Sequence, residues 1–171
     1  MTKIILVTGG QRSGKSLFAE QLALAASDQP IYMATSRVWD AEYEQRIILH
    51  QRRREANWLT IEEDKQLSKH SVEGRVVLVD CVTLWATNYF FDLDSHIEQA
   101  LQALQHEFDS LTKQQAQFIF VTNEIGLGGT LENKLQRQFT DLLGWLNQYI
   151  ADRADEVYFT VSGIPMKIKG N

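Results

Sequence analysis

The chain has 171 residues, of which 44% are hydrophobic, and a formal net charge of −5 at pH 7. This length predicts a single domain over residues 1–171, whose core needs no metal or disulfide to fold. One cysteine, Cys81, excludes an intramolecular disulfide and favours a reducing compartment, the cytoplasm. The acidic balance argues against nonspecific nucleic-acid binding, and no apolar run approaches the ~20 residues of a membrane span.

Short apolar runs alternate with longer stretches of helical spacing along the chain. We predict strands at 4–8, 31–34, 76–80, 118–122 and 157–161, and helices at 15–26, 40–56, 95–113 and 132–152. The segment from Ser95 to Glu98 has the pattern of a capping box for the third helix. The strands lack alternation between polar and apolar residues, which is typical of strands covered on both faces. The sequence therefore predicts an α/β fold with a mostly parallel, doubly wound sheet.

The first predicted strand is followed by a phosphate-binding motif. The residues are Gly9, Gly10, Gln11, Arg12, Ser13, Gly14, Lys15 and Ser16, which fit G-x-x-x-x-G-K-S. In such a loop the glycines let backbone N–H groups turn toward phosphate oxygens, and the lysine reaches the β- and γ-phosphates. The Ser16 hydroxyl is placed to ligate Mg²⁺, and the start of the next helix favours negative charge. The motif predicts binding of ATP or GTP.

Two acidic residues end later predicted strands. Asp80 closes the run at 76–80, where an acid can bind Mg²⁺ directly or through water. An ordinary helix-capping role is the alternative for Asp80. Glu124 follows the strand at 118–122 and precedes a glycine-rich loop, which suits a transferase whose acid orients or deprotonates an acceptor hydroxyl. The alternative for Glu124 is a solvated turn with a helix-capping role.

The predicted helix at 40–56 carries one histidine among several arginines. Arg46, Arg53 and Arg54 lie four residues before and three and four residues after His50, so a helix places them on one face. Neighbouring cations disfavour the imidazolium and keep His50 in the neutral form that can attack phosphorus. The arginines could also clamp phosphates and stabilise departing pyrophosphate. The alternative interpretation is a solvated basic helix face.

With these motifs in place, the chain resembles the bifunctional adenosylcobinamide kinase / adenosylcobinamide-phosphate guanylyltransferase family of cobalamin biosynthesis. The resemblance runs from Ile4 to Lys169. It includes the phosphate loop and the segments at 32–36, 40–50, 79–88, 121–128, 137–148, 154–157 and 162–165. The sequence departs from the usual family pattern at Glu55, Thr130, Leu131 and Thr140.

The resemblance implies a RecA-like P-loop fold and two reactions. A nucleoside triphosphate, ATP or GTP, phosphorylates the aminopropanol hydroxyl of adenosylcobinamide. GTP then donates GMP, through a guanylylated His50, to the new phosphate and releases pyrophosphate. The resemblance also implies nucleotide contacts from Thr35, Ser36 and Glu62, Mg²⁺ as cofactor, and a homo-oligomer, with a trimer as one form.

Two alternatives remain open at this level. One is a family member that keeps a single activity, for which Thr130, Leu131 and Thr140 are the positions of interest. The other is a GTP-binding regulator. A GTPase switch needs an Asn-Lys-x-Asp segment for guanine after a late strand, and the segment beginning at Asn123 lacks that lysine and aspartate.

Overall fold

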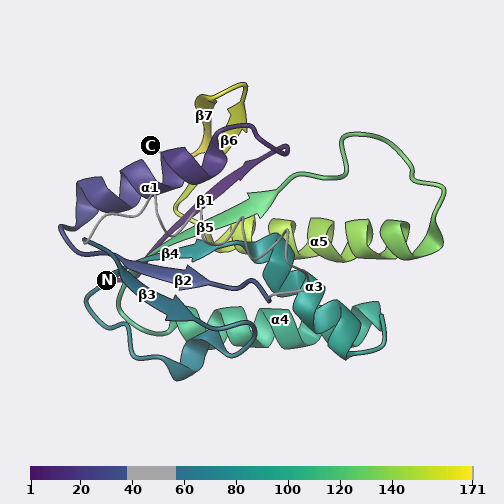
Figure 1. The fold of residues 1–171 in the computed structure, drawn as a ribbon, viewed down its shortest axis with the longest axis horizontal. Helices are drawn as coiled ribbons and strands as arrows, with labels where there is room; N and C mark the ends of the chain where they lie inside the picture. The colour runs from purple at the N-terminus through teal and green to yellow at the C-terminus, as the bar shows by residue number, and fades with distance from the viewer. Residues whose placement is uncertain (38–56, 171) are drawn as a thin grey trace.

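The computed structural model describes residues 1–37 and 57–170, and its centre is a seven-stranded sheet in the order β3-β2-β4-β5-β1-β6-β7 (Figure 1). All neighbouring strands pair in parallel except β6 and β7, which form an antiparallel hairpin at one edge. The strands are β1 (Lys3–Gly9), β2 (Ile31–Ala34), β3 (Leu59–Glu62), β4 (Val76–Asp80), β5 (Gln117–Asn123), β6 (Glu156–Val161) and β7 (Ile164–Lys169).

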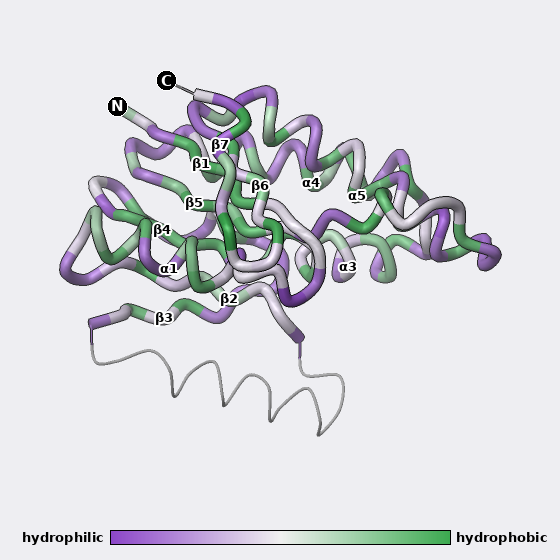
Figure 2. Tube along the Cα trace, turned by 90° about the horizontal axis from the view of Figure 1, so that it is seen from above, coloured by the Kyte–Doolittle hydropathy of each residue, from purple (hydrophilic) through white to green (hydrophobic). Residues whose placement is uncertain are grey.

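Helices cover both faces of the sheet, which is why its central strands are apolar on both sides. The helices are α1 (Lys15–Ala26), α3 (Val82–Asp92), α4 (Ile97–Thr112) and α5 (Lys134–Arg153), with a short 3₁₀ turn, η1 (Leu67–Lys69). Ile4 and Leu6 of β1 point into the core under α3, α4 and α5, whereas Ile5 and Val7 pack on the face covered by α1. Figure 2 shows this hydrophobic interior running through the sheet. The predicted doubly wound α/β fold is confirmed.

Besides the short 3₁₀ turn η1, three elements of the described chain were absent from the sequence prediction. The strand β3 is a short edge strand whose side chains are mostly exposed, so it lacks an apolar run. The helix α3 begins directly after β4, and its apolar residues continue the strand's run without a turn between them. The strand β7 contains Pro165, which a sheet tolerates at its edge because the outer side needs no donor.

The predicted capping box at Ser95 is wrong. Helix α4 has His96 as its N-cap, with no side-chain hydrogen bond at the cap. Asp94 and Ser95 instead have positive φ angles of 51° and 62°, and the Ser95 N–H donates to the Phe90 carbonyl at 2.8 Å. Ser95 therefore belongs to the tight turn that ends α3. The predicted helix at 40–56 lies outside the described residues.

Candidate nucleotide site

The phosphate loop connects the carboxyl end of β1 to the start of α1. Arg12 and Gly14 have positive φ angles of 56° and 91°, and the Ser13 N–H donates to the Gly10 carbonyl at 3.3 Å. These angles curl the backbone back on itself, as the motif predicts. Gly14 is the N-cap of α1 and offers no side chain there, so the helix start is open to an anion.

Lys15 lies at the base of this loop with only 9% of its surface exposed. Its ammonium group donates to the Gly10 carbonyl at 3.0 Å, which keeps Nζ inside the loop's concave side. Burial lowers the pKa of Lys15 below its ordinary value, while the nearby Asp80 carboxylate opposes that shift. The loop lysine and the acid at the end of β4 are thus electrostatic neighbours, although 65 residues separate them in sequence.

Oxygen atoms suitable for Mg²⁺ lie at the same edge of the sheet as the phosphate loop, the edge formed by the carboxyl ends of the strands. The Ser16 hydroxyl stands at the first turn of α1, and Asp80 ends β4 two strands from β1. The Tyr32 hydroxyl donates to Asp80 Oδ2 at 2.5 Å and orients that carboxylate. One hydroxyl and one carboxylate fit Mg²⁺, which takes oxygen ligands and completes its shell with substrate phosphates and water. Within the described ranges, no group of three or more His, Cys, Asp or Glu residues could hold a metal alone.

The hairpin of β6 and β7 holds the phosphate loop from the other side, a contact that the sequence analysis missed. Thr160 is 1% exposed, and its hydroxyl lies 2.8 Å from the Ser13 hydroxyl. Thr160 Oγ1 also donates to the Thr8 carbonyl at 3.1 Å, so the Ser13 hydroxyl donates to Thr160. At the hairpin turn, the Gly163 N–H donates to the Ser13 carbonyl at 2.8 Å.

Close packing at this contact explains two glycines of the motif. A Cβ on Gly9 would lie 2.6 Å from Ser13 Oγ and 2.7 Å from the Thr160 carbonyl oxygen. A Cβ on Gly14 would lie 3.0 Å from Gly163 Cα, in addition to the strain of its positive φ. Ser162 and Gly163 both have positive φ, as the two central residues of a type I′ hairpin turn require. The turn dipeptide was the only sequence signal for this contact.

The predicted nucleotide residues at the end of β2 have a structural partner. The Thr35 hydroxyl is fully buried, donates to the Cys81 carbonyl at 2.8 Å and accepts from the Cys81 N–H at 2.9 Å. The Asn88 amide donates to the Thr35 carbonyl at 2.7 Å, so α3 also holds this segment. Ser36 is half-buried just beyond it, and Glu62 is exposed at the end of β3. Their nucleotide contacts stay predictions.

Cys81 is a small buried residue next to Asp80. It is a free cysteine with 9% exposure, and burial raises the pKa of its thiol to about 12. A thiol in this state is a poor nucleophile.

Glu124 contacts the phosphate loop through its backbone. Its N–H donates to the Gly9 carbonyl at 2.9 Å, directly beside the phosphate loop. Its carboxylate accepts from the Gly126 N–H at 2.7 Å and from the Leu127 N–H at 3.2 Å. The carboxylate therefore closes a turn, whereas Asn133 and not Glu124 caps the next helix, α5. The role of Glu124 as a base stays a prediction. His50, Arg46, Arg53, Arg54 and Glu55 lie outside the described residues.

The loop, its lysine, the strand-end acid and the doubly wound sheet together define a P-loop nucleotide-binding protein of the RecA-like class. In this class a strand, here β5, separates the phosphate-loop strand β1 from the acid-bearing strand β4. The flagellar accessory protein FlaH from Methanocaldococcus jannaschii has this fold, with a TM-score of 0.50 and 15% sequence identity. The match covers 99% of this chain and 79% of FlaH. At this identity the likeness concerns the fold alone.

Sequence comparison identifies the family. The family model described as cobinamide kinase / cobinamide phosphate guanyltransferase matches residues 5–168, and the chain belongs to this family. It is 41% identical over 170 residues to the bifunctional adenosylcobalamin biosynthesis protein CobP of Pseudomonas aeruginosa, covering 96% of both chains. It is also 41% identical over 181 residues to the bifunctional protein CobU of Escherichia coli K12, covering 97% of this chain and 99% of that relative. The family predicted from the sequence motifs is confirmed. Within the described residues, no helix has the length and apolar character required to cross a membrane.

Proposed function

We propose that this chain catalyses two successive transfers to adenosylcobinamide. In the first, the γ-phosphoryl group of ATP or GTP passes to the aminopropanol hydroxyl. In the second, GMP from GTP passes to the new phosphate. The proposal rests on one observation. The chain matches the bifunctional family over residues 5–168, and its phosphate loop has the curled backbone and the inward-held Lys15 that triphosphate binding needs.

For the kinase step, the site residues supply position and positive charge. The curled backbone from Gly9 to Gly14 directs N–H groups at the phosphates, and Lys15 is held where it can reach the β- and γ-oxygens. Ser16 and Asp80 would hold Mg²⁺, which would neutralise charge on the triphosphate. The hydroxyl proton of the acceptor passes to Asp80, at the end of β4, or to Glu124, which follows β5.

For the guanylyl step, His50 is proposed as the nucleophile. The neutral imidazole nitrogen attacks the α-phosphorus of GTP, an N–P bond forms, and the bond to the pyrophosphate oxygen breaks. The acceptor phosphate then attacks the same phosphorus and releases the imidazole, so covalent catalysis divides one displacement into two. Arg53 and Arg54 would stabilise departing pyrophosphate. The sequence spacing supports this role.

A labelling experiment tests the guanylyl step. The protein is incubated with α-labelled GTP and Mg²⁺, denatured, and assayed for protein-bound label that is acid-labile and base-stable, as a phosphoramidate is. The label is expected in the wild type and absent in His50→Ala. A wild type that binds GTP but acquires no label refutes the proposed intermediate and favours a single-activity member or a regulator.

We also propose that the chain forms a homo-oligomer in the cytoplasm. The edge strand β7 supports association, because Ile164, Met166 and Ile168 are 65%, 46% and 63% exposed along it. The free thiol of Cys81 supports a reducing compartment. Light scattering of the purified protein gives the subunit number, and a strictly monomeric mass would refute the association.

A further inference from the structure

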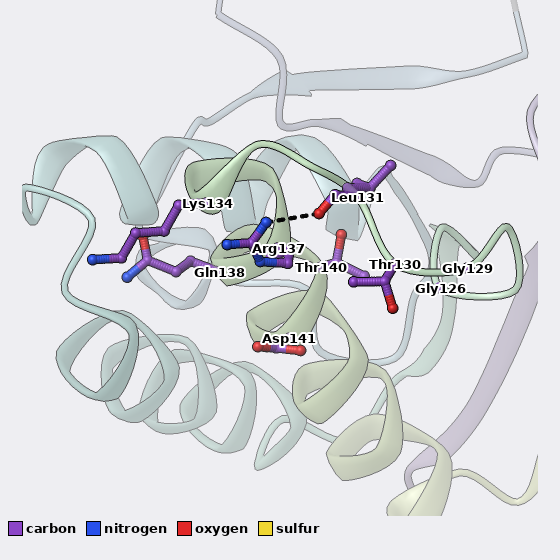
Figure 3. Close-up of a pocket in the computed structure, with 9 residues that line it drawn as sticks. All are labelled: Gly126, Gly129, Thr130, Leu131, Lys134, Arg137, Gln138, Thr140 and Asp141. Atoms are coloured by element: carbon purple, nitrogen blue, oxygen red, sulfur yellow. Dashed lines mark hydrogen bonds between the residues drawn. The ribbon is translucent and has the colours of Figure 1, made fainter.

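A pocket that contains none of the phosphate-loop residues lies between the β5–α5 connection and the start of α5. Its volume is about 600 Å³, and its lining comes from the β5–α5 connection and the first two turns of α5 (Figure 3). The residues that line it are Gly126, Gly129, Thr130, Leu131, Lys134, Arg137, Gln138, Thr140 and Asp141. This volume is within the usual range of ~300–1,000 Å³ for small-molecule sites.

The pocket is connected to the phosphate loop through a few residues of backbone. Strand β5 pairs with β1 so that Asn123 lies opposite Gly9, and the next residue, Glu124, donates its N–H to the Gly9 carbonyl. The Glu124 carboxylate then accepts from the N–H of Gly126, which is the first residue of the pocket lining. A ligand in the pocket would therefore lie at the same carboxyl edge of the sheet as a bound triphosphate, where open α/β sheets bind their ligands.

The lining is mixed in chemistry and partly fixed in position. Arg137 Nη1 donates to the carbonyls of Leu131 at 2.8 Å and Glu132 at 2.5 Å, which ties the loop to α5. Thr130, Thr140 and Gln138 supply hydroxyl and amide groups, and Leu131 supplies an apolar surface that is 40% exposed. In the described part of the chain, Lys134 lines the pocket and forms no side-chain hydrogen bond or ion pair, so its charge has no counter-ion there.

We propose that this pocket binds one edge of the corrinoid acceptor and that Lys134 contacts the phosphate added in the first reaction. The inference rests on the proposed function. A corrinoid carries amide side chains around an apolar macrocycle, so hydroxyl, amide and leucine groups in one cavity match it. After the kinase step the acceptor gains a phosphate, and a lysine without a counter-ion at the pocket wall supplies the opposite charge.

Filling the pocket tests the inference. Thr140→Phe places a ring in the cavity from the helix side, and Gln148→Phe adds the same ring at an exposed position further along α5. Equilibrium dialysis with cobinamide, read by corrin absorbance, and the KM values of the kinase reaction give the result. We expect Thr140→Phe to weaken cobinamide binding about tenfold or more, with the KM for ATP unchanged and Gln148→Phe like the wild type.

Lys134→Ala tests the charge. We expect a rise of about fivefold in the KM for adenosylcobinamide phosphate in the GMP-transfer reaction, and little change in the KM for unphosphorylated cobinamide. Equal effects on both acceptors would refute the contact between Lys134 and phosphate. Lys113→Ala, at the far end of α4, is the matched control for loss of one surface charge.

The outcomes separate the pocket from the proposed function. If the wild type binds and phosphorylates cobinamide but both Thr140→Phe and the loop variant Thr130→Phe retain wild-type KM values, the pocket assignment is wrong and the function stands. If the same variants raise the KM for GTP or ATP instead, the pocket belongs to the nucleotide. A wild type that binds no cobinamide overturns both. Thr130→Phe serves where Thr140→Phe fails to fold, because Thr130 is exposed on the loop.

Discussion

We predict that Thr160 stabilises the conformation of the phosphate loop and so affects triphosphate binding. It lies about 150 residues from the loop in sequence. Its hydroxyl makes two buried hydrogen bonds, with the Ser13 hydroxyl at 2.8 Å and the Thr8 carbonyl at 3.1 Å. Thr160→Val keeps the shape of the side chain and removes both. Each bond contributes ~1 kcal/mol net, and a buried hydroxyl left without a partner costs ~1–3 kcal/mol.

The expected effect has a structural and a functional part. The free energy of unfolding should fall by about 2–3 kcal/mol, which lowers Tm by roughly 4–12 °C in a domain of this size. Because Ser13 is part of the phosphate loop, kcat/KM for the triphosphate should fall about fivefold, which corresponds to ~1 kcal/mol of lost positioning. Thr160→Ser keeps the hydroxyl and should recover most of the activity.

Thermal denaturation and steady-state kinetics of both reactions check this prediction. Thr112→Val is the control, because the Thr112 hydroxyl donates to the Phe108 carbonyl of its own helix at 2.8 Å, away from the loop. This variant should leave kcat/KM unchanged. If Thr160→Val lost stability but kept wild-type nucleotide kinetics, the hairpin would be only a structural support and the reasoning would be wrong.

The other predictions concern the phosphate loop itself and the stability of the fold at acidic pH. Lys15→Ala should weaken triphosphate binding and nearly abolish phosphoryl transfer, and unchanged turnover would exclude its assigned role. Gly9→Ala should yield little folded protein by circular dichroism, because the new Cβ meets the Thr160 carbonyl oxygen at 2.7 Å, and a wild-type Tm would contradict this. Burial alone would raise the pKa of Glu63, but hydrogen bonds from Lys69 and backbone N–H groups outweigh it and lower the pKa to about 2. A lowered carboxyl pKa stabilises the fold above its unfolded value near 4.5, so up to ~3 kcal/mol should be lost as the pH falls from 4.5 toward 2. Denaturant titrations of Glu63→Gln should show a shallower loss over this range, and an identical slope would count against the assignment.

The sequence by itself determined the chemistry of the loop and the class of fold. The G-x-x-x-x-G-K-S spacing encodes its own conformation, because glycines at fixed positions permit the backbone angles that bring N–H groups to phosphate. Apolar runs without alternation identified the central strands for a similar reason, since a strand covered on both faces has no polar side. Local information was sufficient for both.

Tertiary structure decided which distant residues complete the site. Thr160 and Gly163 reach Ser13 only because β6 pairs with β1 in one register, and no local pattern records that pairing. Tertiary packing likewise decided three other features that no local pattern records. They are the buried hydroxyl of Thr35, the carboxylate of Glu124 that closes a turn, and the elements β3, α3 and β7. Each depends on what packs against it, and a strand at an edge or a helix without a polar side gives no periodic signal of its own.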